Sequence, residues 1–521
     1  MSNNSRLYKS FLNARVNLFF YFITLLLSFF SRKVFLDSLG ADFVGLTGTL
    51  QNLLGFLNLA EMGIGAAIGY VLYRPLFDDN KEKINEIISV LGYMYRCVGL
   101  FILVAGVVVS LFLPRIFLNV KYDPLLIYFI YYSFIASSLI SYFINYKQTL
   151  LGADQRNYVV TAYYQSANIC KIMIQMLLAL RTGNYYLWAG IELIFGIIYS
   201  IVLNYKIKQV YPWLKSDVKL GKRLLNQYSD VIKYTKQLFV HKIASIVYGQ
   251  ITPLLVYAFA SLQTVAFYGN YTMIVSKLDA LINNILTSTS AGVGNLIAEG
   301  DTEKTLKIYW ELMSIRFWVA GLFVFVLYHI LPSFITLWLG REYMLSNTVL
   351  VAVLISFFLG IVRGTNDQFI LGFGLFADIW APIVEAFLLI SVAIIGGKIW
   401  GFEGTLLGTI VSTVLIVYIW KPYYLFKKGF KLHVKKYWYP WFKHLLLLLL
   451  AFLLGRYVIT KIKYLDYLDK NWLRFVISST IISLIYSILS MVIFYTCLKS
   501  TRDVTKRLLS FLRNRNFMGI S

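Results

Sequence analysis

Basic side chains stand inside long apolar stretches of this 521-residue sequence, at Arg96, Lys171, Lys277 and Arg316. Ionised groups in such stretches usually face the interior of a helix bundle or a water-filled cavity, because hydrocarbon does not solvate them. The planar guanidinium of arginine suits phosphate in particular, since it donates hydrogen bonds in pairs. Arg32, at the end of the first apolar stretch, extends the basic series. The excess of cations predicts an anionic substrate whose route passes these five side chains.

Each of these residues also has a simpler interpretation. Arg96 and Arg316 have long side chains that would reach lipid headgroups from the end of a segment, and Arg32 fits ordinary interfacial anchoring. Lys171 lies too deep in its segment to reach the headgroups easily. Glu192 in the next segment is one partner for Lys171, and an ion pair between them would be structural.

Small and polar residues form a second pattern, which includes the carboxylate of Glu61. They recur every three or four positions, along one broad side of a helix. The members are Gly48, Asn52, Gly55, Asn58, Glu61, Gly65 and Gly69, and the stretch 265–297 has a similar series in Lys277, Asn284, Thr287, Ala291 and Gly294. Both stretches are predicted to line a cavity. Close helix packing is the alternative, because small residues let helices approach one another.

Arg363, Asp367 and Glu385 are candidates for ion coupling or gating. Carboxylates at such positions are the groups that a cation-driven antiporter needs. The apolar stretches nevertheless contain more basic residues than a carboxylate-centred ion exchanger requires. This balance favours an anionic substrate over a cationic one.

The elements that position these residues are membrane-spanning helices. Hydrophobic residues make up 59% of the chain and charged residues 14%, with a mean hydropathy of +0.67, whereas a typical soluble domain is about 25% charged. At about 20 apolar residues per helical span, fourteen segments qualify: 16–36, 43–73, 87–113, 125–146, 158–180, 186–205, 238–260, 265–297, 308–331, 347–372, 380–397, 404–424, 442–460 and 473–497. The sequence predicts an all-α polytopic membrane protein with about fourteen transmembrane helices.

The two halves of the chain share landmarks in the same order. Gln148 recurs as Gln368 at the offset at which Arg96 recurs as Arg316. Each half has six spans, so both halves begin on the same side of the membrane. This arrangement predicts two six-helix lobes that are related by a pseudo-two-fold axis along the membrane normal.

Basic segments divide the chain into four predicted parts. Residues 1–205 form the N-terminal six-helix lobe, and residues 206–237 form a basic cytoplasmic linker. Residues 238–426 form the C-terminal six-helix lobe. Residues 427–521 hold a second basic linker, transmembrane helices 13 and 14 as an appended hairpin, and a cytoplasmic tail.

The net charge of +24 comes from 49 basic and 25 acidic residues. Most of the basic residues fall in alternate loops that include the N-terminal segment, so the positive-inside rule places both termini in the cytoplasm. Attraction to anionic lipid explains the remaining excess, and no nucleic-acid partner is expected. The first apolar segment is expected to remain as an anchor, because it is too long for a signal peptide. The three cysteines show neither metal-ligand nor disulfide spacing and are expected to be buried thiols.

Several short runs give the sequence a family resemblance. They are residues 334–340, 372–378, Trp380-Ala381-Pro382, Glu385, Gly401, Gly404, Gly408-Thr409 and Lys421-Pro422 in the second half, and residues 32–40, Gly45-Leu46, 59–63 and 72–76 in the first. With these runs the chain resembles bacterial polysaccharide-biosynthesis flippases, which act on O-antigen or capsule repeat units. They belong to the multidrug/oligosaccharidyl-lipid/polysaccharide (MOP) exporter superfamily. The similarity covers about residues 10–430.

The resemblance implies a function and its partners. Two lobes would form a V and move an undecaprenyl-pyrophosphate-linked oligosaccharide from the cytoplasmic to the periplasmic leaflet of the inner membrane by alternating access. Related lipid flippases have a cationic cavity and a groove for the lipid tail near the last two helices. Members commonly have twelve spans, so the extra hairpin departs from that pattern. Membrane lipids and a glycan polymerase are the other partners expected.

Two other functions remain open from the sequence. A multidrug or cation antiporter of the same superfamily would use Glu61, Asp367 or Glu385 for its substrate or coupling ion. A membrane glycan polymerase or ligase is disfavoured, because the outside loops are short and no catalytic constellation is present. No cofactor or metal site is expected, and Na⁺, H⁺ and the membrane potential are each compatible as the driving force.

Overall fold

In the computed structural model all regular secondary structure of the described residues is helical, and these residues are all except 1–2, 62, 229–230, 234, 236–248, 288, 376, 463–470 and 518–521. Within this part of the chain, nine helices are long and apolar enough to cross a membrane. The protein is therefore an all-α, multi-span membrane protein, as the composition predicted. Part of the predicted span 238–260 lies outside the described residues, and Gly249–Phe259 is a short apolar helix.

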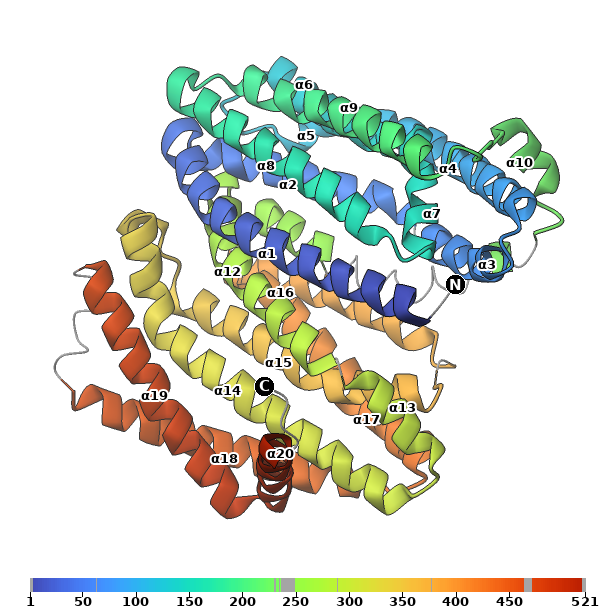
Figure 1. Cartoon of the computed structure of the whole chain (residues 1–521). Helices are drawn as coiled ribbons and strands as arrows, with labels where there is room; N and C mark the ends of the chain where they lie inside the picture. The colour runs from blue at the N-terminus through green and yellow to red at the C-terminus, as the bar shows by residue number, and fades with distance from the viewer. Residues whose placement is uncertain are drawn as a thin grey trace. The chain divides into compact units, whose positions relative to one another are not determined.

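The helices divide into two compact units, Met1–Ala266 and Phe267–Ser521. The first unit (blue to green in Figure 1) contains α1 (Asn3–Leu39), α2 (Ala41–Leu57), η1 (Asn58–Glu61), α3 (Ile64–Phe77), α4 (Lys81–Ser110), α5 (Leu113–Ile116), α6 (Pro124–Phe143), η2 (Asn145–Lys147), α7 (Gln148–Ala153), α8 (Asn157–Thr182), α9 (Tyr185–Val210) and α10 (Val218–Leu224). Helix α12 (Leu262–Thr287) begins in this unit and continues into the second.

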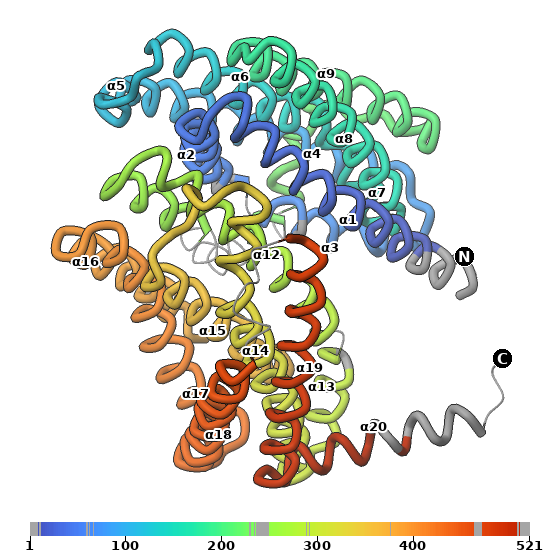
Figure 2. Tube along the Cα trace, turned by 90° about the vertical axis from the view of Figure 1, so that its left-hand side faces the viewer, coloured from blue at the N-terminus to red at the C-terminus, as the bar shows by residue number. Residues whose placement is uncertain are grey.

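The second unit contains the remaining helices, yellow-green to red in Figure 1. They are α13 (Ser290–Ala298), α14 (Thr302–Trp338), η3 (Arg341–Tyr343), α15 (Asn347–Gly372), α16 (Trp380–Ser412), η4 (Thr413–Trp420), α17 (Lys421–Tyr424), η5 (Leu425–Phe430), α18 (Lys435–Thr460), α19 (Trp472–Cys497) and α20 (Lys499–Phe517). Figure 2 shows α20 turning away from the axis of α19. Leu498, in extended conformation between the two helices, makes this turn.

Short polar side chains begin many of the long helices. Asn80, Asp123 and Asn184 accept backbone hydrogen bonds at the starts of α4, α6 and α9. Asp301 and Ser346 do the same for α14 and α15. Each cap satisfies a backbone N–H that has no partner in the first turn of a helix. These residues end the loops and fix where each apolar helix begins.

Two predicted spans are interrupted in the structure. The stretch 43–73 is divided into α2 and α3 by η1, and Gly63 between them has a φ of 90°, which favours glycine. The stretch 265–297 is likewise divided into α12 and α13. Polar residues concentrate where both stretches break, because interrupted backbone at membrane depth has to be satisfied by protein or water.

The predicted spans 380–397 and 404–424 lie on either side of a sharp kink within α16. Trp400 and Gly401 have non-helical dihedral angles, and the φ of Gly401 is 61°. A Cβ atom at Gly396 would overlap the backbone of Gly404, and one at Gly408 would overlap that of Leu389. The two arms of the kinked stretch therefore run back along each other, and glycine allows the close approach.

Aromatic packing marks the core of each unit. In the first unit Phe43 stacks on Tyr185 at 4.5 Å and meets Trp188 edge-on at 5.5 Å between ring centroids. In the second, Phe325 of α14 stacks on Tyr486 of α19 at 3.8 Å. The last hairpin is thus packed against α14. The expectation of buried thiols was wrong, because all three cysteines are exposed on the faces of their helices.

Candidate functional site

Arg316 lies in the middle of α14 and is almost completely buried, with 1% of its surface exposed. Its Nη1 donates to the backbone carbonyl of Ile361 on α15 at 3.0 Å and to Oδ1 of Asn283 on α12 at 3.2 Å. Its Nη2 is buried and has no hydrogen-bond partner in the described part of the chain. One guanidinium therefore joins α12, α14 and α15 and keeps donor capacity free.

Asn283 also connects Arg316 to an acidic residue that lies one turn earlier on α12. Its Nδ2 donates to Oδ1 of Asp279 at 3.0 Å. Asp279 lies within electrostatic reach of both Arg316 and Arg363. The amide therefore links the carboxylate to the guanidinium inside the second unit.

A second group of charges surrounds Asp367 on α15. Its Oδ2 accepts from Nε of Arg363 at 2.9 Å, one turn earlier on the same helix, and its Oδ1 accepts from Nζ of Lys421 at 3.2 Å. Glu385 of α16, only 8% exposed, faces Arg363, Lys421 and Asp367. We call Asp279, Arg316, Arg363, Asp367, Glu385 and Lys421 the inner charge cluster.

Glu385 differs from the other members of the inner charge cluster. Its carboxylate makes no hydrogen bond or ion pair with any residue that the structure describes. A buried carboxylate without a bonded partner is costly unless it binds a proton, a cation or water. Glu385 is therefore the acidic group of the cluster that is available for ion binding.

An apolar groove with a volume of about 400 Å³ runs between α14, α15 and α18 of the same unit. Its walls include Tyr328 of α14, Leu354 and Phe358 of α15, and Leu449 and Phe452 of α18. Carbon atoms make up nearly all of its surface. A hydrocarbon chain is the ligand that such walls suit.

The groove and the inner charge cluster follow one another along the same two helices. On α14, Arg316 precedes the groove residue Gly321 by five positions, which is about 7.5 Å of helix. On α15, the groove residue Phe358 precedes Arg363 by five positions. An apolar surface therefore passes into a charged region along both helices.

Glu61, in the first unit, sits at the break between α2 and α3. Its Oε1 accepts from the hydroxyl of Tyr95 and its Oε2 from that of Tyr142, both at 2.8 Å. Both tyrosines are buried. The carboxylate thus fastens the broken segment to α4 and α6. Asn58, at the same break, accepts from Ser138 at 3.2 Å, and its Oδ1 lies 3.2 Å from the hydroxyl oxygen of Tyr142.

The other basic residues singled out in the sequence lie in different settings. Nη2 of Arg32 donates to the carbonyl of Ala266 at 2.8 Å and so holds the start of α12 against α1. Arg96 is exposed on α4, and Lys277 is half-buried on α12. Nζ of Lys171 lies 2.8 Å from Oε1 of Glu192, which is the pairing considered as its structural alternative.

Arg96 and Arg316 therefore differ in their surroundings despite corresponding positions in the two halves. One is exposed and the other almost fully buried. Their matched positions do not produce matched environments, because the polar partners Asn283 and Asp279 belong to α12 of the second unit.

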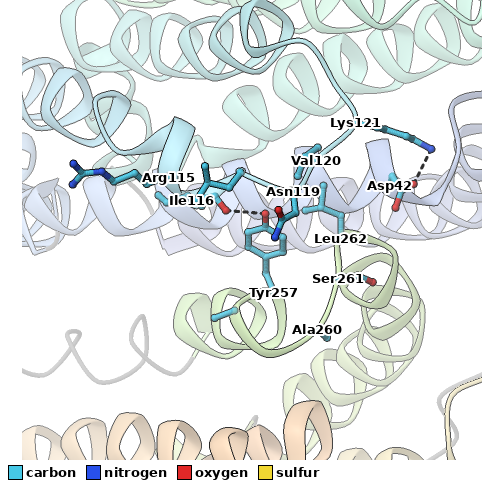
Figure 3. A pocket seen from close by; sticks show the side chains of 12 residues that line it. Asp42, Arg115, Ile116, Asn119, Val120, Lys121, Tyr257, Ala260, Ser261 and Leu262 are labelled. Carbon is cyan, nitrogen blue, oxygen red and sulfur yellow. Dashed lines mark hydrogen bonds and ion pairs between the residues drawn. The ribbon is translucent and has the colours of Figure 1, made fainter.

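A further pocket of about 410 Å³ lies in the first unit, between the α5–α6 connection and the start of α12. The hydroxyl of Tyr257 donates to the carbonyl of Ile116 at 2.9 Å, and Lys121 pairs with Asp42 at 2.9 Å. Asp42 raises the pKa of Lys121 by accepting a hydrogen bond from it. Figure 3 shows Arg115 and Lys121 pointing away from Tyr257 in opposite directions. The two positive charges do not point toward a common position, so this pocket is a gap between packed segments and not an anion site.

Sequence reasoning missed Asp279, Asn283 and the part played by Lys421. Asp279 and Asn283 stand four positions apart, a spacing that places them on one helix face, and this spacing was the signal available. Among the described residues, no group of three or more histidine, cysteine, aspartate and glutamate side chains could hold a metal ion. The site consists of ion pairs and hydrogen-bonding groups.

No protein-family model matches the sequence, and no curated protein matches it either. Solved structures do match the fold. The chain is similar to the lipid II flippase MurJ in an inward closed conformation, with a TM-score of 0.64, 15% identity, and coverage of 94% of this chain and 100% of the other.

Two transporter structures match as well. An inward-facing multidrug resistance MATE family transporter of the MOP superfamily gives a TM-score of 0.59 at 13% identity, with 80% and 99% coverage. A MATE structure in the bent conformation gives 0.51 at 13% identity, with 81% and 96% coverage. The solved structures that share this fold are transporters and not enzymes. The protein is thus a multi-pass membrane protein with the fold of MOP-superfamily transporters.

Proposed function

We propose that this chain is a flippase. It moves an undecaprenyl-pyrophosphate-linked oligosaccharide repeat unit from the cytoplasmic to the periplasmic leaflet of the bacterial inner membrane, for O-antigen or capsule biosynthesis. The observation that carries the proposal is that the apolar groove and the inner charge cluster lie next to each other along α14 and α15. An amphiphile with a hydrocarbon tail and an anionic headgroup has the same succession of apolar and charged parts.

The physical requirements of flipping fit this arrangement. A pyrophosphate has to cross about 30 Å of hydrocarbon, so it needs cations along its path, while the polyprenyl tail stays in an apolar environment. Arg363 and Lys421 are partly exposed, at 30% and 17% of their side chains, and share a single carboxylate. A pyrophosphate that reaches these two cations competes with Asp367 for them.

The proposal includes an architecture and an orientation. About fourteen transmembrane helices form two six-helix lobes, at 1–205 and 238–426, with a basic linker at 206–237. Residues 427–521 hold a second linker, the last hairpin and the tail, and both termini are cytoplasmic. The two lobes alternate between openings to either leaflet. Packing of α18 and α19 against α14 supports a role of the hairpin in forming the apolar groove.

We assign the substrate path to Arg32, Glu61, Arg96, Lys171, Lys277 and Arg316. Arg363, Asp367 and Glu385 are assigned to coupling or gating. Glu385 has the burial and the free carboxylate that a coupling ion requires. Na⁺, H⁺ and the membrane potential are the driving forces to be compared, and a glycan polymerase is the proposed downstream partner.

A multidrug or cation antiporter is the alternative, and the free carboxylate of Glu385 is the observation in its favour. The other acidic candidates are engaged: Glu61 accepts from two tyrosines, and Asp367 pairs with two cations. Drug-resistance and vesicle-uptake assays separate the two functions. A glycan polymerase or ligase is the third possibility, and glycan joining by the purified protein would support it.

Deletion of the gene in its host tests the proposal. The expected result is loss of surface polysaccharide together with accumulation of the lipid-linked oligosaccharide in the cytoplasmic leaflet. The accumulated lipid would also identify the sugars. Normal surface polysaccharide and normal levels of the lipid carrier would contradict the proposed function.

A further inference from the structure

A polar pocket lies among α6, α8 and α9 of the first unit, where α9 packs against both of the other helices (Figure 1). Its volume is about 150 Å³. One buried water needs about 10–15 Å³ on this measure, while pockets for drug-sized ligands begin at about 300 Å³. The pocket has room for a single sugar ring and not for a whole oligosaccharide.

The charges in this pocket cancel. Lys171 of α8 pairs with Glu192 of α9, and both side chains are about four-fifths buried. The second carboxylate oxygen of Glu192 accepts from Gln175 at 3.4 Å. The ammonium of Lys171 has three donors, and among the residues that the structure describes its one acceptor is Glu192. The pocket is therefore neutral and keeps N–H donors free for a ligand.

Asn145 and Ser200 also line the pocket, and the amide of Asn145 donates a hydrogen bond to the hydroxyl of Ser200 at 2.8 Å. Three more polar lining side chains are Ser137 and Ser141 of α6 and Asn168 of α8. None of them hydrogen bonds to another group in the part of the chain that the structure describes. Unsatisfied polar groups at membrane depth are costly, so groups of this kind normally meet water or a ligand. Together with Lys171 they offer several donors and acceptors within one small volume.

Two tyrosine rings add apolar surface to this polar lining. Tyr164 of α8 is half exposed, and its ring lies 5.4 Å from that of Tyr199 of α9 in an edge-to-face arrangement. The hydroxyl of Tyr199 donates to Gln148 at 3.2 Å, which fixes the orientation of its ring. A sugar ring has an apolar face of C–H groups and a rim of hydroxyls, and the lining of this pocket matches both features.

We infer that this pocket binds one uncharged sugar ring of the transported glycan. The inference rests on the proposed function, because it takes the glycan from the lipid-linked substrate. The pocket favours an uncharged ligand over a charged one, because Glu192 repels an anion and Lys171 repels a cation. A neutral polyol is repelled by neither residue, and its hydroxyls supply hydrogen-bond partners for Ser137, Ser141 and Asn168.

Binding to the purified protein in lipid nanodiscs tests the inference. The two probes are undecaprenyl pyrophosphate and the same carrier bearing the host's oligosaccharide. Asn168→Leu removes an amide from the pocket and is expected to weaken binding of the glycosylated carrier about threefold to tenfold. Binding of undecaprenyl pyrophosphate is expected to stay unchanged. Ser141→Ala, a milder change, is expected to act in the same direction.

Ser166→Leu is the matched control, because Ser166 lies on the same helix, is exposed and does not line the pocket. It is expected to leave both affinities unchanged. Equal weakening of both probes by Asn168→Leu, or no weakening of either by both pocket variants, would overturn the inference while the flippase proposal stands. Failure of the unaltered protein to bind either probe would overturn both.

Discussion

The guanidinium of Arg316 lies directly against the backbone of Gly364, so that a Cβ atom at position 364 would overlap Nη1. Gly364 lies on α15, three residues after Ile361, whose backbone carbonyl accepts a hydrogen bond from Arg316. Because Gly364 has no side chain, the buried guanidinium of Arg316 on α14 can lie against the backbone of α15. The glycine and the arginine are therefore expected to act as a pair.

Gly364→Ala is expected to destabilise the protein by about 1–3 kcal/mol, the usual result of adding a methyl group to a packed site. The measurement is the midpoint of thermal unfolding in detergent. Gly360→Ala, one turn earlier on α15, is the matched control, because a Cβ atom there meets only Asp279 at an ordinary distance of 3.6 Å. Equal midpoints for the two variants would contradict the packing of Arg316 against Gly364.

Asp367→Asn is expected to lower both stability and export, because it leaves Arg363 and Lys421 without their shared carboxylate. Removing one partner of a fully buried ion pair costs about 3–5 kcal/mol. Asp367 is 37% exposed, so solvent screening is expected to reduce this cost. Thermal unfolding and surface polysaccharide per molecule of protein measure the two effects. A variant that matches the unaltered protein in both would remove Asp367 from the inner charge cluster.

The apolar groove gives a prediction about the lipid tail. Leu449→Trp places a large ring in the groove between α14, α15 and α18 and is expected to reduce surface polysaccharide at normal protein level. Leu446→Trp makes the same change three positions earlier on α18, at an exposed residue outside the groove lining. It is expected to have no effect. Loss of export by both variants, or by neither, would speak against a tail site in the groove.

Helix α20 is attached to α14 by two ion pairs, Lys307 with Asp503 at 3.1 Å and Arg507 with Glu311 at 3.2 Å. The hydrogen bond from Lys307 lowers the pKa of Asp503. A carboxyl with a lowered pKa in the folded state stabilises the attachment above the unfolded value of about 3.9. This stabilisation is lost as the pH falls below that value.

Spin labels at positions 304 and 510, both exposed, measure the attachment of α20 by their distance distribution. The distribution is expected to broaden only as the pH falls through the lowered pKa of Asp503, which lies below the ordinary value of about 3.9. Asp503→Asn is expected to produce the broadening already at pH 7. An unchanged distribution in that variant would mean that the ion pair does not hold α20.

The apolar helices could be predicted from the sequence because hydropathy over about 20 residues reports directly on membrane burial. The breaks at η1 and between Thr287 and Ser290 could not, since polar and small residues in those stretches fit an unbroken helix face equally well. Contacts across helices explain what was missed in the site. Asp279 and Asn283 belong to the site only because α12 contacts Arg316 of α14, and the sequence alone does not show this contact.

Lys171 and Glu192 illustrate the opposite case. Their pairing was among the alternatives from the sequence, because neighbouring antiparallel segments place a deep lysine and a glutamate within reach of each other. The polar pocket around the pair was not predictable, since Ser137 and Ser141 belong to α6, which precedes both helices of the pair in the chain and contacts α9 only in the folded structure. Side-chain pairs between consecutive helices are accessible to sequence reasoning, whereas the lining of a pocket depends on three-dimensional packing.

Lipid movement in proteoliposomes measures flipping itself. Purified protein is reconstituted with a polyprenyl-pyrophosphate-linked oligosaccharide that carries a fluorescent group, and a membrane-impermeant quencher is then added outside. Nearly all fluorescence is expected to be quenched with the unaltered protein, because flipping brings inner-leaflet lipid to the outer surface. Quenching limited to the outer leaflet, as in liposomes without protein, would contradict the claim that this chain is a lipid-linked oligosaccharide flippase.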